Sequence, residues 1–298
     1  MESNLSWREY AITRVIRAAG YSAIVFVALI FYFLLKEGLP TLAEVKLGDL
    51  FALRWYPIEN YFGLLPLISG SLVVTLGATL VAVPFGIVTA VFIAEIAPRW
   101  AREILKPLVE LLGGLPSVVL GFLGILVLAP KLRVLLNLPT GLTAFTGSLL
   151  LGAIALPTVV SIAEDALDSV PRSYREGAWA LGATRWQTIW RVTLPAARSG
   201  VLTAVMLGIG RAIGETMTVM MVTGNAPVLA TSLGSLFSPV RTMTATIAAE
   251  MGEVSNGSVH YHTLFFIGML LFIISLIVNV SASAVVFRSQ KRGEKVLS

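Results

Sequence analysis

The chain has 298 residues, of which 56% are hydrophobic and 13% are charged, and its mean hydropathy is +0.84. Soluble domains carry about 25% charged residues, so the composition excludes a soluble protein and indicates an integral protein of the lipid bilayer. The absence of cysteine excludes disulfides, thiolate metal sites and thiol nucleophiles. The net charge of +5 raises the question of a nucleic-acid partner.

Six apolar stretches are long enough to cross a bilayer as helices, since about 20 residues span a hydrocarbon layer of ~30 Å. They are residues 18–35, 68–96, 107–129, 143–163, 201–223 and 263–287. The first resembles a secretory signal, but Lys36 and Glu37 follow it without a small-residue cleavage pattern, which favours an uncleaved anchor. The second contains Pro84, which predicts tilt or a kink. The predicted fold class is therefore all-α, integral membrane.

Basic residues gather on one side of these six spans. If both termini are cytoplasmic, fifteen lie inside, namely Arg8, Arg14, Arg17, Arg99, Arg102, Lys106, Arg172, Arg175, Arg185, Arg191, Arg198, Arg288, Lys291, Arg292 and Lys295. Only six lie outside, namely Lys36, Lys46, Arg54, Lys131, Arg133 and Arg241. This positive-inside bias predicts cytoplasmic termini and explains the basic balance, so we expect no nucleic-acid partner.

These assignments divide the chain into four parts. They are a cytoplasmic tail over residues 1–17, a first transmembrane helix over 18–35, a core over 60–287 and a cytoplasmic tail over 288–298. The core holds the other five transmembrane helices and the long inside loop 164–198.

The inside loop between the fourth and fifth spans predicts two short helices. Pro171 is suited to the start of a helix, residues 176–181 are predicted to form a short helix, and Gly182 permits a turn after it. A second helix over 185–192 would end at Pro195. Such a projection suits a groove on another protein, with its tryptophans as anchors. The alternative is a pair of interfacial helices whose tryptophans rest among lipid headgroups.

The fifth span contains the run GRAIGET, with Arg211 and Glu215 one helical turn apart. Arg211 lies about 15 Å from the start of the span, near the bilayer midplane. Arginine there costs about 2.5–3.5 kcal/mol on insertion scales, so it needs a partner and a protein or water environment. An intrahelical pair with Glu215 is possible, although Arg before Glu is the weaker order. Gly208, Gly210 and Gly214 predict close approach of a neighbouring helix.

The inside loop resembles the EAA loop of ABC importer permeases, whose pattern is E-A-A, three residues, G, nine residues, then I-x-L-P. The matching residues are Glu176, Gly177, Ala178, Gly182, Leu194 and Pro195. Gly177 stands where the family has its first alanine, and Val192 where it has isoleucine. In the family this loop is the coupling helix, which docks on a separate ATP-hydrolysing subunit.

Two further stretches resemble the permeases of phosphate importers. Residues 115–122, LPSVVLGF, are similar to the PSVV-x-G-F signature, and residues 211–216 to the R-x-x-G-E-T run. Sulfate and molybdate permeases usually show G-E-F at the latter place, so Thr216 favours phosphate. Residues 243–253, followed by His260 and Tyr261, resemble the PstC-type subunit more than its PstA-type partner.

The resemblance implies the type I ABC importer permease fold in a prokaryotic inner or plasma membrane. Its implied partners are a second related permease, a dimer of ATP-binding subunits, an extracytoplasmic phosphate-binding protein and inorganic phosphate. The chain lacks the phosphate-binding pattern G-x-x-x-x-G-K-[ST]. We therefore expect a transport subunit that is not itself an enzyme, with no cofactor and with ATP hydrolysed by a partner.

Arg211, Glu215 and Thr216 are the expected substrate-pathway residues, because a guanidinium matches phosphate oxygens in a bidentate way. Three alternatives stay open: a purely structural pair against the partner permease, a pathway for sulfate or molybdate, and a membrane scaffold or sensor of phosphate status. Structural roles are expected for Glu95, Glu110, Glu164, Asp165 and Asp168, the last three beside the coupling loop or paired with its arginines. His260 and His262 lack a third ligand, so we predict no metal site.

Overall fold

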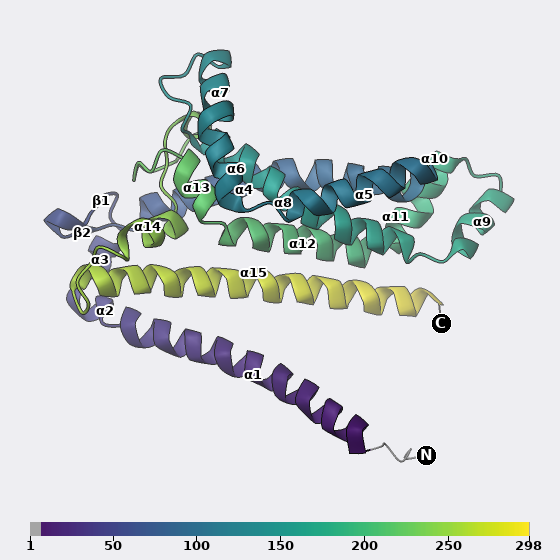
Figure 1. Cartoon of the computed structure of the whole chain (residues 1–298), viewed down its shortest axis with the longest axis horizontal. Coiled ribbons are helices and arrows are strands. Elements are labelled where there is room, and N and C mark those ends of the chain that lie inside the picture. Colours follow the sequence, from purple (N-terminus) through teal and green to yellow (C-terminus); the bar gives the residue numbers. More distant parts are fainter. Residues whose placement is uncertain (1–6, 298) are drawn as a thin grey trace.

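A computed structural model describes residues 7–297, which form an elongated helical bundle with one small hairpin (Figure 1). The long helices are α1 (Trp7–Gly38), α4 (Leu65–Val91), α5 (Arg99–Gly113), α8 (Ala144–Asp168), α12 (Arg198–Gly214) and α15 (Val259–Leu297). The shorter ones are α2 (Thr41–Glu44), α3 (Leu47–Leu50), α6 (Ser117–Leu123), α7 (Ala129–Leu135), α9 (Arg172–Ala180), α10 (Arg185–Thr188), α11 (Leu194–Ala196), α13 (Met217–Val222) and α14 (Met243–Glu250). Three π-helical turns continue longer helices: η2 (Phe92–Ile96), η3 (Gly124–Leu128) and η4 (Ile189–Thr193).

The two ends of the bundle differ in structure. One end, here called the hairpin end, carries the antiparallel strands β1 (Trp55–Tyr56) and β2 (Tyr61–Phe62) together with α2, α3 and α14. The opposite end, here called the loop end, carries α9, α10 and α11. Figure 1 shows the start of α1 and the end of α15 at the loop end, on the same side as the expected coupling segment. This arrangement agrees with the sequence prediction that the termini and the loop share one side.

Five helical stretches are long and apolar enough to cross a membrane: Tyr10–Glu44, Leu65–Ile96, Ser117–Leu135, Ala144–Asp168 and Val259–Ser281. The bent pair Arg185–Ala196 and Arg198–Gly214, with an angle of 72° between its parts, would be a sixth. The predicted first, second, fourth and sixth spans lie on these helices. The second continues through Pro84 as one helix, and its irregular turn is η2 instead.

The third and fifth predicted spans are each broken, unlike the single helices expected. Residues 107–129 contain the end of α5, a break at 114–116, α6 and η3. The break follows from Gly113, Gly114 and Pro116, because glycine disfavours helix and proline cannot donate a backbone hydrogen bond. Residues 201–223 divide into α12 and α13, with Glu215 extended (ψ 129°) between them.

Helix ends also lie outside the predicted limits. Residues 7–17 of the predicted N-terminal tail belong to α1, and residues 288–297 of the predicted C-terminal tail belong to α15. Residues 1–6 and 298 of these tails lie outside the described part of the chain. A polar sequence marks where apolar character ends, but helical hydrogen bonds continue into water, so hydropathy underestimates helix length.

Helices α4, α8 and α12 pack closely because glycines face Val159 of α8. A Cβ on Gly86 of α4 would lie 2.7 Å from Val159 Cγ1, and a Cβ on Gly208 of α12 would overlap Val159 Cγ2. Close approach at Gly208 was predicted and is confirmed. It does not occur at Gly210, where the nearest atom would be 3.9 Å away, or at Gly214, where a Cβ would meet nothing within 4 Å.

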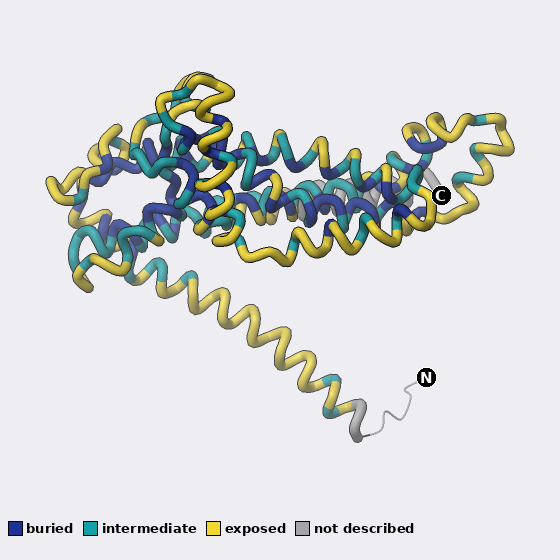
Figure 2. The backbone as a smooth tube through the Cα atoms, turned by 45° about the horizontal axis from the view of Figure 1, so that its top comes forward, coloured by how far each residue is buried: buried dark blue, intermediate teal, exposed yellow. Residues whose placement is uncertain are grey.

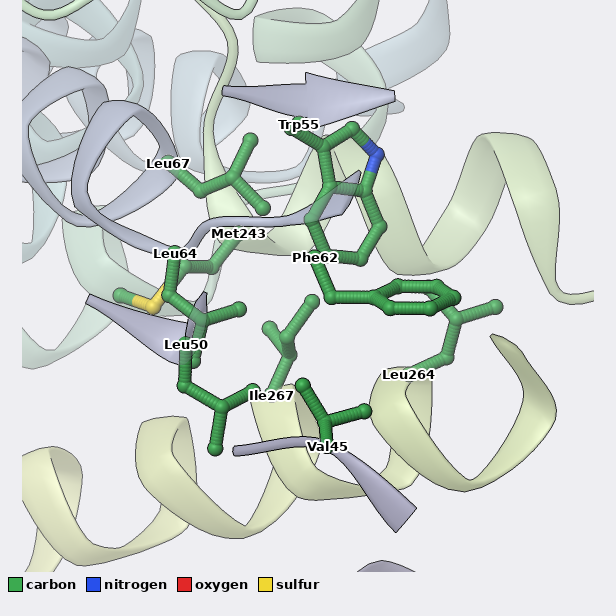
Figure 3. Packing of buried hydrophobic residues seen from close by; sticks show 9 residues of the cluster. All are labelled: Val45, Leu50, Trp55, Phe62, Leu64, Leu67, Met243, Leu264 and Ile267. Carbon is green, nitrogen blue, oxygen red and sulfur yellow. The ribbon is translucent and has the colours of Figure 1, made fainter. Parts of the chain in front are cut away.

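A hydrophobic cluster holds the hairpin end together (Figure 3). Its buried members come from the α2–α4 region, α14 and α15, and are Val45, Leu50, Trp55, Phe62, Leu64, Leu67, Met243, Leu264 and Ile267. Burial of such side chains contributes about 1.5–3 kcal/mol each. The cluster therefore ties the hairpin to the ends of two spans.

Helix α1 lies apart from the bundle along most of its length, and Figure 2 shows its surface exposed. Its contact with the bundle is near its C-terminal part, where Phe31 stacks on Phe272 of α15 with ring centroids 4.9 Å apart. The exposed side chains of α1 are largely apolar, as suits a surface that faces lipid or protein.

A polar knot beneath the hairpin is centred on Glu250, at the end of α14. Its carboxylate accepts hydrogen bonds from Trp55 Nε1 (3.2 Å) and pairs with Arg241 Nη1 and His260 Nε2, both at 2.8 Å. Burial raises the pKa of Glu250, but the His260 hydrogen bond, the Arg241 charge and the Trp55 hydrogen bond outweigh it, so the pKa lies below the ordinary 4.5. The ionised carboxylate thus stabilises the fold.

Replacing Glu250 by glutamine is expected to destabilise the hairpin end by about 1–3 kcal/mol, because hydrogen bonds to a charged group are lost. Hydrogen exchange of residues 55–62 measures the effect. In the unmodified chain, protection of residues 55–62 from hydrogen exchange is present above pH 4.5. It is lost as the pH falls through the lowered pKa of Glu250. The exposed Glu253→Gln is the control. Equal exchange in both variants would contradict this account of the knot.

Candidate substrate pathway and coupling segment

The two broken spans meet at their breaks. Thr218 of α13 donates a hydrogen bond from Oγ1 to the carbonyl of Ser117 at the start of α6 (2.8 Å). A Cβ on Gly121 of α6 would lie 2.8 Å from Met221 Sδ and 3.2 Å from Thr218 Cα. The stretch 115–122 is therefore in contact with α13, which directly follows the second signature-like stretch, residues 211–216.

Arg211, on the last turn of α12, has an exposed side chain next to these breaks. Its Nη1 donates to Thr158 Oγ1 of α8 (3.0 Å) and its Nη2 to the carbonyl of Gly113, the last residue of α5 (3.1 Å). A guanidinium has five N–H donors, so these two bonds fix its orientation and leave others for a ligand. No carboxylate among the described side chains of residues 10–281 lies within 4 Å of it, so its charge is uncompensated in that part of the chain.

The intrahelical pair of Arg211 with Glu215 does not form, because the helix ends at Gly214 and Glu215 leaves the helical register. Glu215 Oε1 instead accepts from the backbone N–H of Thr218 (3.4 Å), and its main-chain carbonyl accepts from Thr244 Oγ1 of α14 (3.2 Å). Thr216 Oγ1 donates to the carbonyl of Gly214 (3.2 Å). The structure thus gathers Arg211, Glu215 and Thr216 around one helix break.

The interior beside this break is packed. Hydroxyl and apolar side chains surround Glu215 there, namely Ser71, Val74, Thr75, Leu151, Ala212, Ile213, Val219, Thr242 and Thr244. The free space among them is about 10 Å³, which one water molecule fills. The interior beside Glu215 therefore has no room for an anion, whereas the side chain of Arg211 is exposed at the surface of the chain.

Sequence patterns missed the two groups that orient Arg211. Thr158 lies in an apolar run of α8, and the Gly113 acceptor is a backbone carbonyl, which any residue would supply. Gly113, Gly114 and Pro116 were the sequence signal for the carbonyl that binds Arg211. These residues break the helix, and a broken helix leaves carbonyls without helical partners.

The predicted turn at Gly182 forms in the expected coupling segment, residues 171–195, but the predicted limits of its helices were wrong. Helix α9 starts at Arg172 and not at residue 176, and the second helix does not end before Pro195, because η4 and α11 continue through it. Helix α9 begins directly after Pro171 and is closed by hydrogen bonds from Gly182 N to the Trp179 carbonyl (2.9 Å) and from Ala183 N to the Ala178 carbonyl (3.0 Å). This is the Schellman pattern, with Gly182 at φ +80°. Helix α10 follows with a capping box formed by Thr184 and Gln187.

The segment projects from the loop end with its expected docking residues accessible. Within α9, Glu176 and Gly177 are exposed, no residue is fully buried, and Leu181 at its end is 91% exposed. Trp179, Trp186 and Trp190 are also exposed, and the last two pack edge-to-face. Leu194 and Pro195 lie in the helical turns that lead into α12.

Glu95 anchors the segment to η2, which continues α4, and the structural role predicted for this residue is observed. Arg175 of α9 donates to Glu95 Oε1 from Nη2 at 2.6 Å, and to the carbonyls of Val170 and Leu167 at the end of α8. Arg185 donates to the Glu95 carbonyl. Both ionised groups of the Arg175–Glu95 pair are mostly buried, so breaking it would leave a costly unpaired charge.

Glu164, Asp165 and Asp168 lie beside the coupling segment, which was one of the two predicted alternatives, since three residues separate Asp168 from the start of α9. They bind α5, not the arginines of the coupling loop. Glu164 accepts from Arg102 and Lys106, Asp165 from Lys106, and Asp168 from Arg102. The Glu164 hydrogen bond raises the pKa of Lys106 above its ordinary 10.5, against the opposite effect of burial. Helix α5 and the end of α8 are distant in sequence but lie side by side in the fold. Sequence patterns do not predict such a contact.

The two histidines have separate partners at the hairpin end. His260 Nε2 bonds Glu250, whereas His262 Nδ1 lies 2.8 Å from the carbonyl of Glu37. Their imidazoles therefore serve two different contacts.

A family model described as the binding-protein-dependent transport system inner membrane component matches residues 82–292. The chain belongs to this family. The match includes both broken spans and the coupling segment, so the elements described above form the shared core of a membrane permease. The family description places such permeases in the inner membrane.

Named relatives of this permease agree with that assignment. The probable ABC transporter permease protein YqgH of Bacillus subtilis is 44% identical over 228 residues, covering 76% of this chain and 73% of that protein. The phosphate transport system permease protein PstC of Mesorhizobium japonicum is 33% identical over 309 residues, covering 96% and 93%. PstC 1 of Mycobacterium tuberculosis is 34% identical over 254 residues, covering 78% and 75%.

Solved structures show the same fold. A bacterial alginate ABC transporter aligns with a TM-score of 0.61 and 16% identity, covering 93% of this permease and 95% of that chain. The MetNI methionine ABC transporter, in an inward-facing conformation, aligns with a TM-score of 0.56 and 19% identity, covering 76% and 94%. The predicted type I ABC importer permease fold is confirmed.

Replacing Gly182 by valine is expected to reduce ATP-driven uptake strongly, because a β-branched residue does not tolerate φ +80°. Space is not the cause, since a Cβ at this position meets nothing within 4 Å. Gly182→Asn is the matched control, because asparagine accepts the left-handed conformation, and it should retain most uptake. Uptake of labelled substrate by membrane vesicles is measured for both variants. Similar activity of the two would show that the turn does not carry the coupling.

Proposed function

We propose that this chain is the permease subunit of an ATP-driven importer of inorganic phosphate. It forms the translocation pathway together with a second, related permease. A dimer of ATP-binding subunits binds the coupling segment, and an extracytoplasmic phosphate-binding protein delivers the substrate to the hairpin end. The termini and the loop end are then cytoplasmic, as the positive-inside pattern indicates.

The uncompensated guanidinium of Arg211 carries this proposal. It lies exposed at the meeting point of two broken spans, held by Thr158 and Gly113 and without a carboxylate partner among the described side chains of residues 10–281. A charge at that depth is costly unless a ligand, water or partner meets it. Phosphate at neutral pH carries between one and two negative charges, and its oxygens fit the donors of the guanidinium.

A pathway at the interface between this chain and a second permease explains why Arg211 is exposed while the interior beside Glu215 is packed. The single chain has no room for an anion beside Glu215, so a second permease must supply the other wall of the conduit. Glu215 accepts a hydrogen bond from a protonated phosphate oxygen, which sulfate lacks at neutral pH. Thr216 adds a hydroxyl donor at the same break.

Coupling to ATP hydrolysis requires a part of the chain that the ATP-binding subunit can bind. Exposed Trp179 and Leu181 and the glycine turn at Gly182 form a slim apolar projection, supported by the resemblance of residues 176–195 to the EAA loop. ATP-driven closure of the partner moves this projection and switches the pathway between outward and inward access.

The test is uptake of labelled phosphate by the complete complex in proteoliposomes, with and without ATP inside. We expect uptake only with ATP and with the phosphate-binding protein present, and we expect excess unlabelled phosphate, but not sulfate or molybdate, to compete. Competition by sulfate or molybdate would assign the chain to another oxyanion. No ATP-dependent uptake, with normal phosphate-dependent signalling by cells that carry the chain, would indicate the sensor alternative.

A further inference from the structure

Helix α5 is fixed to α8 by a charged cluster outside the pathway. Glu164 is only 1% exposed, and its two oxygens accept from Arg102 Nη2 at 2.5 Å and from Lys106 Nζ at 2.6 Å. The more exposed Asp165 and Asp168 add one bond each. One cation would balance the charge of Glu164. Two cations from successive turns of one helix also fix where that helix lies.

Apolar packing holds α5 on one side only, where Val109 belongs to a buried hydrophobic cluster. Only Ala101 and Val109 of this helix are buried, whereas Trp100, Ile104 and Leu108 are exposed. The other side of α5 therefore lacks contacts within residues 7–297. The charged cluster adds to this one-sided packing and fixes α5 to α8 at Arg102 and Lys106.

The cluster lies next to the coupling segment. Asp168 is the last residue of α8, and three residues separate it from the start of α9 at Arg172. Arg175 of α9 donates to the carbonyl of Leu167 in the last turn of α8 and to that of Val170 just after it, so movement of α9 must pull on that end. Figure 1 shows α9 at the loop end beyond the bundle, with α5 lying along the bundle towards α6.

The other end of α5 reaches the pathway. From Lys106 to Gly113 the helix rises about 10 Å, and the Gly113 carbonyl accepts from Arg211 Nη2 at 3.1 Å. Contacts are thus continuous from α9 through the end of α8, the charged cluster and α5 to the guanidinium.

We infer that α5 is the lever that carries movement of the coupling helix α9 to Arg211, and that Glu164 is the positioning residue that fixes this lever to α8. When α9 is displaced, α5 follows because Glu164 holds two of its turns. The Gly113 carbonyl then shifts relative to Thr158, which changes the orientation of Arg211. The inference rests on the proposed function and deepens it, since it names the connection between ATP hydrolysis and the anion site.

Glu164→Gln tests the lever in the complete complex, reconstituted in proteoliposomes with its second permease, ATPase and phosphate-binding protein. The variant keeps the shape of the side chain and removes its charge. We expect it to copurify with its partners and to hydrolyse ATP, while phosphate transported per ATP falls about tenfold. Asp165→Asn is the matched control, because the side chain of Asp165 is 69% exposed. In this variant the amount of phosphate transported per ATP should change by less than about twofold.

An unchanged transport ratio in Glu164→Gln would overturn the inference, since a merely structural role predicts loss of assembly but normal coupling of the complex that remains. If this variant does not assemble, Lys106→Met replaces it, because Arg102 then still neutralises Glu164. A smaller fall in the same ratio supports the lever, and no fall overturns it. A wild-type complex that transports another anion would refute the proposed substrate, and the ratio would then be measured with that anion.

Discussion

Replacing Arg211 by alanine is expected to reduce phosphate uptake about 100-fold or more while the complex still assembles. The substitution removes charge-assisted hydrogen bonds to the passing anion, and two such bonds contribute about 3 kcal/mol or more. Assembly should survive because Arg211 makes only two bonds to the rest of the described chain, to Thr158 and Gly113, and its side chain is exposed. Proteoliposome uptake and copurification of the subunits measure the two effects separately.

Arg211→Lys is the informative companion of this variant. Lysine keeps the charge but loses the planar fork, so uptake should lie between that of the wild type and that of alanine. Dissociation of the complex in Arg211→Ala would favour the structural alternative, in which the arginine bonds the partner permease. Normal uptake kinetics would remove Arg211 from the mechanism.

Replacing Gly121 by leucine is expected to abolish most uptake by separating the two broken spans. The first added carbon already meets Met221 Sδ at 2.8 Å and Thr218 Cα at 3.2 Å, and the second of these is backbone that cannot rotate away. Overpacking of this kind costs about 1–3 kcal/mol, and it also pulls Thr218 from the Ser117 carbonyl. The break that supports Arg211 would lose its shape.

Uptake and thermal unfolding of the purified complex measure this second effect. Gly252→Ala is the control, because a Cβ there meets nothing within 4 Å and the residue is exposed near the hairpin end. Wild-type uptake in Gly121→Leu would mean that contact between α6 and α13 is not needed for transport.

The sequence predicted most of the architecture because bilayer physics leaves few choices. Long apolar runs predicted four spans, and Gly182 predicted the turn of the coupling segment, since both signals are local. The breaks at 114–116 and at Glu215–Thr216 were not predicted, because apolar residues lie on both sides of each break and hydropathy does not register helix breaks. Proline and two glycines marked the first break, but Glu215 and Thr216 carry no comparable signal.

The candidate site was only partly predictable for the same reason. The charge expected near the bilayer midplane made Arg211 the candidate residue, since the cost of a charge in lipid depends on its depth. Its partners depend on which helices meet. Thr158 and the Gly113 carbonyl come from two other helices, and the expected pair with Glu215 fails because the helix ends one residue earlier. The acidic residues of α8 show this limit again, since they bind α5 instead of the nearer coupling loop.

Accessibility of the site to thiol reagents tests the central claim most directly, because a chain without cysteine gives no background. Thr158→Cys places a single thiol beside the guanidinium of Arg211. In the assembled complex we predict that a membrane-impermeant thiol reagent modifies this cysteine and that phosphate slows the reaction. Val159→Cys, fully buried against neighbouring glycines, should not react. A cysteine at position 158 that stays unmodified with and without ATP, or that reacts at a rate phosphate does not change, would contradict a pathway at Arg211.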